Sequence, residues 1–303
     1  MNATSTGGFV PSFRRGSLWM VVSLGCFTTN ALLLKHLGST HGVSAWLALL
    51  FRAVVGFGIV CVFFPPRASN DPRAARGMLN LRRAATGRGL VSRGVLGAFG
   101  TAAYYITLPV LGAGKATLIG NTWVIWSGLM AVFILKEHLV ARQIAGIVIA
   151  ISGLVLLTGV DHHQVSGQGA YEFIAIAGAF IAAATVVVIR QLTRTESSAT
   201  IFASQCIYTA LLALPFVIMS GLDVSAAQSL LLALAAVAAG IGQLAMTEGF
   251  RHLPVTTGGA FQVALPLCIT ICSIALFDET FSLPQAAGAA LIILGGYQAI
   301  GAR

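Results

Sequence analysis

Long apolar stretches, separated by short polar or Gly/Pro-containing turns, follow one another along the chain. Each is about 18 residues or longer, close to the length that an α-helix needs to cross a bilayer. The pattern predicts ten transmembrane helices, at residues 18–37, 43–64, 93–112, 115–135, 141–160, 171–190, 199–220, 227–247, 254–277 and 283–301. The polar stretch 65–92 is expected outside the bilayer, either on the lipid surface through its arginines or as a solvated linker.

Composition supports a multi-pass membrane protein. Of the 303 residues, 57% are hydrophobic and 9% charged, with a mean hydropathy of +0.88, whereas soluble domains carry about 25% charged residues. A soluble enzyme is therefore excluded. The five cysteines fall within apolar stretches, where cysteine acts as a small buried hydrophobe. We expect neither a disulfide nor a metal site, and no cofactor or nucleotide-binding motif is found.

The positive charges are distributed unevenly along the chain. With the N-terminus inside, fifteen of the eighteen Lys and Arg residues fall on the inner side, Lys35 and Lys115 fall on the outer side, and Arg52 lies within a span. Cytoplasmic loops are enriched in Lys and Arg, so both termini are predicted to be cytoplasmic, in the cytoplasmic membrane. The net charge of +9 is then explained by topology and by anionic membrane lipids. No nucleic-acid partner is needed.

A short pattern occurs twice, with an offset of 142 residues. Residues Glu137, Gln143, Ala145, Gly146, Ile151 and Gly153 recur as Glu279, Gln285, Ala287, Gly288, Ile293 and Gly295. The chain is therefore predicted to hold two repeats, 1–160 and 161–303. Because five helices per repeat is an odd number, the second repeat should be inverted relative to the first. Inverted repeats are typical of secondary transporters, whose substrate site lies near the midplane.

The repeats also resemble a known family, the EamA branch of the drug/metabolite transporter superfamily, over essentially the whole chain. The resemblance rests on the acidic turns 135–137 and 277–279, the Gly-rich last helix of each half, the stretches 104–115 and 246–257, and the Phe51-Arg52 pair. It implies an alternating-access carrier of small metabolites, more often an exporter, with a central cavity lined by the first, third and fourth helices and their partners. Pro266 stands where the ninth helix of the family often has a proline, whereas the fourth helix departs from the pattern with Val124.

Arg52 is the first candidate for substrate binding. It lies about ten residues into the second predicted helix and hence near mid-bilayer, where a guanidinium is costly unless it is paired or faces water. Its forked donors suit a substrate carboxylate or phosphate. The alternative is a structural arginine that bonds helix-end carbonyls or extends toward the membrane surface.

Other polar and aromatic residues are candidates for the same cavity. Asn30, Asn121 and Gln262 could form hydrogen bonds with substrate, or could join helices to one another. Tyr104, Trp123 and Trp126 could stack on the apolar part of a substrate, or could face lipid, which is the commoner position of membrane tryptophan.

Coupling residues are harder to find. None of the nine acidic residues or six histidines falls within the middle of a predicted span, so no buried proton relay is evident and exchange or facilitated diffusion is favoured. Glu248, beside Arg251 and His252, is a candidate for coupling or gating, or forms a plain interfacial salt bridge. Pro266 is a second gate candidate because proline removes a backbone donor.

The sequence thus predicts an all-α integral membrane protein that is a secondary transporter, not an enzyme. Its partners would be membrane lipids and a small amphipathic or anionic substrate such as an amino acid, and it would act as a monomer or homodimer. The alternatives are an integral-membrane enzyme acting on a lipid or small metabolite, and a membrane scaffold that transports nothing.

Overall fold

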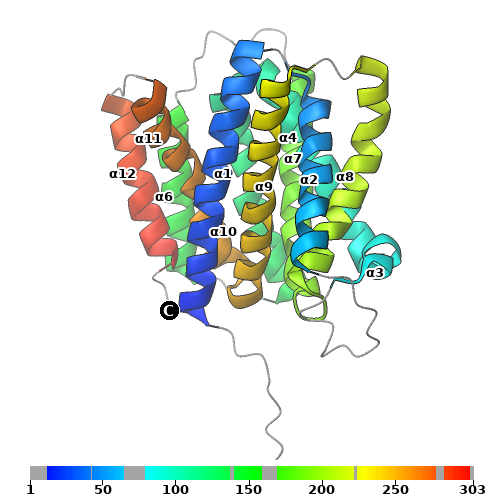
Figure 1. Ribbon diagram of the computed structural model, residues 1–303. Coiled ribbons are helices and arrows are strands. Elements are labelled where there is room, and N and C mark those ends of the chain that lie inside the picture. Colours follow the sequence, from blue (N-terminus) through cyan, green and yellow to red (C-terminus); the bar gives the residue numbers. More distant parts are fainter. Residues whose placement is uncertain are drawn as a thin grey trace, which may run out of the picture.

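The computed structural model describes residues 12–41, 43–64, 79–136, 140–158, 169–221, 224–277 and 283–300. Within these ranges the chain is helical and forms no β-sheet (Figure 1). Glu137, Asp278 and Glu279 of the two acidic turns, and most of the polar stretch after α2, lie outside the described residues. The elements are α1 (Phe13–His41), α2 (Ala45–Phe63), α3 (Leu81–Thr86), α4 (Arg88–Asn121), α5 (Trp123–Met130), η2 (Ala131–Leu135), α6 (Ala141–Thr158), α7 (Gly169–Leu192), α8 (Ser198–Ser220), α9 (Ala226–His252), α10 (Val255–Val263), α11 (Leu265–Phe277) and α12 (Leu283–Ile300).

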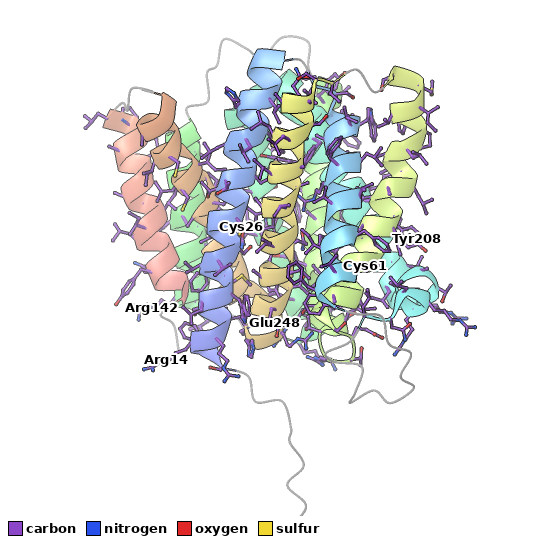
Figure 2. The ribbon with its side chains drawn as sticks, in the orientation of Figure 1. Arg14, Cys26, Cys61, Arg142, Tyr208 and Glu248 are labelled. Carbon is purple, nitrogen blue, oxygen red and sulfur yellow. The ribbon has the colours of Figure 1, made fainter. Side chains whose placement is uncertain are left out.

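Among the residues that the structure describes, five helical segments are long and apolar enough to cross a membrane by length and composition: Phe13–Leu34, Ala45–Phe63, Gly169–Leu192, Ser198–Ser220 and Ala226–His252. Shorter apolar segments are Ile119–Leu135, Ala141–Gly153, Val255–Ile269 and Ala286–Gln298. The start of α1 and the end of α12 lie at the same end of the bundle (Figure 1). Arg14, Arg142 and Glu248 also lie at this end (Figure 2), which we call the basic face.

The chain reverses its direction within α4. A Cβ atom on Gly120 would lie 3.6 Å from Cδ2 of Tyr104, although residues sixteen positions apart on a straight helix are separated by about 24 Å. Leu90 and Ala131 likewise share one hydrophobic cluster. The residues of α4 therefore include both a segment that leaves the basic face and the start of one that returns. This agrees with the two separate stretches, 93–112 and 115–135, that hydrophobicity indicates.

The helices of the first half pack against helices of the second half, and the paired helices are antiparallel. In the α1–α9 pair, Met20 meets Gly249 and Cys26 meets Gly242, so the contacts move in opposite directions along the two helices. The same pattern occurs in four other pairs. In α2–α8 the contacts are Gly56–Phe202 and Trp46–Phe216, and in α4–α7 they are Gly89–Leu192 and Gly178–Ala103. In α5–α10 they are Gly128–Thr256 and Gly259–Val124, and in α6–α12 they are Gly153–Leu291 and Gly295–Gly146.

The glycines of the repeated pattern form the close contact between α6 and α12. A Cβ on Gly153 would lie 2.6 Å from the carbonyl oxygen of Gly288, and a Cβ on Gly295 would meet the carbonyl oxygen of Gly146. Gly146 corresponds to Gly288 and Gly153 to Gly295 under the 142-residue offset. The contact is thus reciprocal, and it needs glycine because only a residue without a Cβ lets two helix backbones approach so closely.

The fourth and ninth predicted helices are both interrupted. The breaks are at Thr122, between α4 and α5, and at Ala264, between α10 and α11, again 142 residues apart. Pro266 explains the second break, since proline supplies no backbone donor to the helix. At the first break, the hydroxyl of Thr122 donates to the carbonyl of Ile119 at 2.7 Å. The two helices are therefore interrupted at matching positions, although only one of them carries the proline.

Candidate functional site

A cavity of about 260 Å³ lies within the bundle and is bordered by both halves. Six of the residues predicted to bind substrate are among its lining residues: Asn30, Arg52, Tyr104, Asn121, Trp123 and Gln262. The remaining lining is mostly apolar or small, with alanines and glycines from α4 and α7. The structure thus brings together polar residues that are distant in the sequence.

Three of the predicted residues lie elsewhere. Trp126 is not among the lining residues; it is 37% exposed and packs edge-on against Phe180, with ring centroids 5.8 Å apart. This places Trp126 on the outer surface, next to α7. Glu248 and Pro266 do not line the cavity either, so any part that they play in transport would be indirect.

Arg52 reaches the cavity from α2. Its Nη2 donates to Oε1 of Gln243 in α9 at 3.4 Å, a long and therefore weak hydrogen bond. Gln243 is itself buried, and its Nε2 has no hydrogen-bond partner among the described residues. Within the described part of the chain, Arg52 is thus held by one weak hydrogen bond, and its guanidinium N–H groups can donate to a ligand in the cavity.

The charge patterns of the sequence miss a second cavity arginine, Arg93. They count it among the inner-side charges, at the first residue of the predicted helix 93–112. In the structure α4 begins five residues earlier, at Arg88, and carries Arg93 into the protein interior, where it is 1% exposed. Its Nη2 donates to Oε1 of Gln205 at 2.8 Å, and Nε2 of Gln205 in turn donates to Thr101 at 3.3 Å. The sequence signal that could have revealed the burial of Arg93 is Gly97, four residues and about one helical turn later. A Cβ at this position would collide with the Arg93 guanidinium.

Two of the cavity amides also join helices. Asn30 in α1 donates to the carbonyl of Ala235 in α9 at 2.9 Å, and Gln262 in α10 donates to Ser23 in α1 at 3.3 Å. Both residues are buried. Their side-chain nitrogens therefore stabilise the bundle, in agreement with the helix-packing alternative, while the same residues border the cavity.

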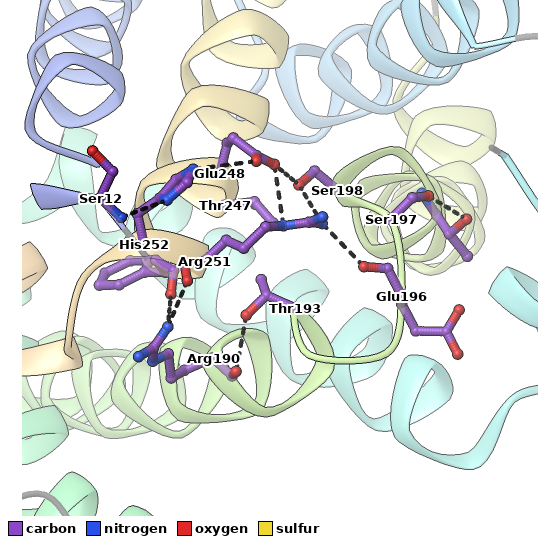
Figure 3. Close-up of polar contacts among 12 residues, drawn as sticks. Ser12, Arg190, Thr193, Glu196, Ser197, Ser198, Thr247, Glu248, Arg251 and His252 are labelled. Carbon is purple, nitrogen blue, oxygen red and sulfur yellow. Dashed lines mark hydrogen bonds and ion pairs between the residues drawn. The ribbon is translucent and has the colours of Figure 1, made fainter. Parts of the chain in front are cut away.

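A network of hydrogen bonds and ion pairs joins the helix ends at the basic face (Figure 3). Arg251 is 8% exposed; its Nη2 donates to the carbonyl of Glu196 at 3.0 Å and to Ser198 at 3.1 Å, and its Nε lies 3.3 Å from the carboxylate of Glu248. Ser198 also donates to Glu248 at 2.6 Å. The network joins the end of α9 to the turn between α7 and α8.

The same network extends to α1 and α7. The backbone N–H of Ser12 donates to Nδ1 of His252 at 3.2 Å, and Nη1 of Arg190 donates to the backbone carbonyls of Phe250 and Arg251 at 2.6 and 2.9 Å. Glu248 therefore has an interfacial salt bridge within a structural network, as one of the two sequence interpretations has it. Its candidacy for coupling stays a prediction.

Glu196 forms a further ion pair at this face. Its carboxylate lies 2.8 Å from Nη2 of Arg83, and the Arg83 side chain is half exposed whereas that of Glu196 is almost fully buried. Burial raises the pKa of Glu196 above its ordinary value, and the positive charge of Arg83 opposes the rise only in part. The folded protein thus binds this proton more tightly than the unfolded chain does.

The raised pKa of Glu196 gives a pH-dependent prediction. The carboxyl contributes stability below its ordinary pKa of 4.5, and this stability is lost as the pH rises through the folded-state pKa. Glu196→Gln should therefore match the parent at acidic pH and gain on it as the pH rises to neutrality. Melting temperatures of both proteins in detergent across this range would check it. A parent that gains on the variant instead would mean that the pair with Arg83 outweighs burial.

The electrostatics of the cavity are one-sided. Its lining contains Arg52 and Arg93 but no aspartate or glutamate within the described ranges. Those ranges also hold no group of three His, Cys, Asp or Glu residues that could bind a metal ion. Such a lining is suited to binding an anion by charge and hydrogen bonds, with Tyr104 and Trp123 to contact apolar atoms.

An all-helical bundle of apolar segments, with a cavity bordered by both halves, has the fold of a transporter-like membrane protein. The chain belongs to the EamA-like transporter family, whose model matches residues 14–159 and 170–299. The predicted family is therefore confirmed, and its members are typically transporters and not enzymes.

One solved structure, described as "Crystal structure of protein", is similar to this chain with a TM-score of 0.78 and 21% sequence identity. The similarity covers 95% of this chain and 97% of that one, and at this identity it shows the fold alone. No curated protein matches the chain.

Proposed function

We propose that this protein is a secondary transporter that moves a small metabolite with a negatively charged group, such as an amino acid or a related amphipathic compound, across the cytoplasmic membrane. The observation that carries the proposal is the cavity between the two halves, in which Arg52 is weakly held and no described lining residue is acidic. A substrate carboxylate or phosphate would supply the negative charge that the neutral amide of Gln243 cannot.

The proposed transporter has ten spans in two inverted five-helix repeats, 1–160 and 161–303. It is supported by the antiparallel pairing of helices from opposite halves and by the reciprocal contact of Gly153 with Gly288 and Gly295 with Gly146. In such a fold, alternating access comes from one half rocking against the other around a central site. The matching breaks at Thr122 and Ala264 supply places where the helices beside the cavity can bend.

In the proposed orientation, the basic face and both termini lie in the cytoplasm. It is supported by the gathering of arginines at that face, where lipid headgroups are anionic. Substrate would leave the cell, as the resemblance to the family implies, and exchange or facilitated diffusion would drive the movement. The cavity supports this mode because its described lining offers no acidic residue as a proton carrier.

Counterflow in proteoliposomes tests the proposal. Vesicles are loaded with a pooled panel of amino acids, nucleosides, vitamins and phosphorylated metabolites, and uptake of each labelled compound is measured without a pH gradient. We expect uptake that depends on internal substrate, and a loss of about tenfold or more in Arg52→Gln, because a charge-assisted hydrogen bond contributes about 1.5–3 kcal/mol.

The matched control is Arg142→Gln, which removes the same charge from an exposed position at the start of α6 and should leave uptake unchanged. Failure of every panel member to move, or an Arg52→Gln variant as active as the parent, would contradict the proposal.

A further inference from the structure

The positive charge of Arg93 is buried without a negatively charged partner among the described residues. The guanidinium is almost completely buried, yet only Nη2 has a hydrogen-bond partner, whereas Nε and Nη1 have none among the described residues. That partner, Gln205, is a neutral amide and does not neutralise the charge. A buried, unpaired cation is strongly destabilising, and residues of this kind inside membranes are typically functional.

Arg93 and Arg52 line the same cavity. A Cβ on Gly56 of α2 would lie 2.8 Å from Phe202 and 3.1 Å from Cys206 of α8. Gln205, the partner of Arg93, directly precedes Cys206 and also lines the cavity. Arg52 is four residues from Gly56, which is about one helical turn. The long side chains of the two arginines thus reach the same cavity from α2 and α4.

Neither of these two arginines has a carboxylate partner among the described residues. Glu196 and Glu248 are engaged in ion pairs at the basic face, Glu196 with Arg83 and Glu248 with Arg251. A substrate with one negative charge would therefore leave one cavity guanidinium without a counter-charge. A substrate with two would satisfy both.

We infer that Arg52 and Arg93 together bind a doubly negative group, so that the substrate is a small dianion, either a phosphomonoester or a dicarboxylate. This rests on the proposed function and narrows its substrate class. Arg93 supplies the guanidinium donors that lack a partner to one negative charge of the substrate, and Arg52, loosely held by Gln243, turns toward the other. Gly97 keeps open the space into which the Arg93 guanidinium extends.

The experiment measures binding to the full-length protein in detergent, through the rise in melting temperature as ligand is added. Two matched pairs serve as probes: succinate with succinamate, and glycerol phosphate with its methyl phosphodiester. Within each pair the second compound lacks the second negative charge, because an amide or a methyl ester replaces one ionised oxygen. We expect the dianion of at least one pair to bind about tenfold more tightly or better than its singly charged analogue, and the pair that responds distinguishes a carboxylate head group from a phosphate.

Substitutions of Arg93 then assign the preference. Arg93→Gln should abolish it by weakening the dianion to the affinity of the monoanion, and Arg93→Lys should restore part of it. Arg88→Gln, an exposed position on the same helix, should leave it unchanged. A purely structural Arg93 would instead lower the melting temperature without changing the ratio of the two affinities.

Measurements on the parent protein can overturn the inference even where the Arg93 variants do not fold: equal affinity for dianion and monoanion in both pairs would do so. Where Arg93→Gln does fold, a preference for the dianion that persists in this variant would also overturn it. Binding and counterflow of amino acids without any response to dianions would also overturn it while leaving the transporter proposal in place. Absence of counterflow for every compound would contradict the transporter proposal itself.

Discussion

Gly295→Ala is expected to force α6 and α12 apart and to lower the stability of the protein by about 1–3 kcal/mol, the usual penalty for overpacking. The added methyl group would run into the backbone nitrogen of Ala150 and the carbonyl oxygen of Gly146. Backbone atoms cannot rotate out of the way as the end of a flexible side chain can. The melting temperature in detergent should therefore fall by roughly 2–12 °C.

The matched control for this prediction is the neighbouring Gly296→Ala. A Cβ on Gly296 would meet nothing within 4 Å, and alanine has the higher helix propensity, so this variant should be as stable as the parent or slightly more stable. Equal melting temperatures for the two variants would contradict the close α6–α12 contact.

Arg251→Met should destabilise the basic face by about 3 kcal/mol, the lower end of the range for a buried ion pair that loses one partner. Methionine keeps much of the apolar stem, but the carbonyl of Glu196 and the carboxylate of Glu248 lose the guanidinium that joins them. The loss stays at the lower end because Ser198 still donates to Glu248. The expected fall in melting temperature is roughly 6–12 °C.

Arg142→Met serves as the control for Arg251→Met, since Arg142 is exposed at the same face. It should melt at the temperature of the parent. If Arg251→Met does so as well, the network in Figure 3 contributes little to stability, and Glu248 would have to be examined as a gate in its own right.

Hydrophobicity was sufficient to locate most of the helices. The stretch 199–220 corresponds to α8 (Ser198–Ser220) and 141–160 to α6 (Ala141–Thr158), because a span must be apolar along its whole length and the turns between spans need not be. The repeated glycines were recognised as a pattern, but their function as a reciprocal contact depends on which helices pack together. That is a tertiary property and carries no local signal.

The cavity was predictable only in part, for two physical reasons. Arg93 stands at the end of an arginine-rich stretch, so its charge resembled that of its exposed neighbours; only the early start of α4 at Arg88 makes it buried. Trp123 and Trp126 are spaced as neighbours on a helix face, yet α5 begins at Trp123, directly after the break at Thr122. One ring borders the cavity and the other packs on Phe180.

The packing of the two halves is reciprocal, but the chemistry of the cavity is not. Both guanidinium groups come from the first half, whereas Gln205, Gln243 and Gln262 come from the second; the position 142 residues after Arg93 is Ala235. In the proposed carrier, a bound anion would therefore be held by charge to the first half alone, whereas the amides that border it come from both halves, Asn30 and Asn121 from the first and Gln205, Gln243 and Gln262 from the second. With the rocking motion proposed above, the anion would move with the first half, so the inward-facing and outward-facing states would bind it with unequal affinities.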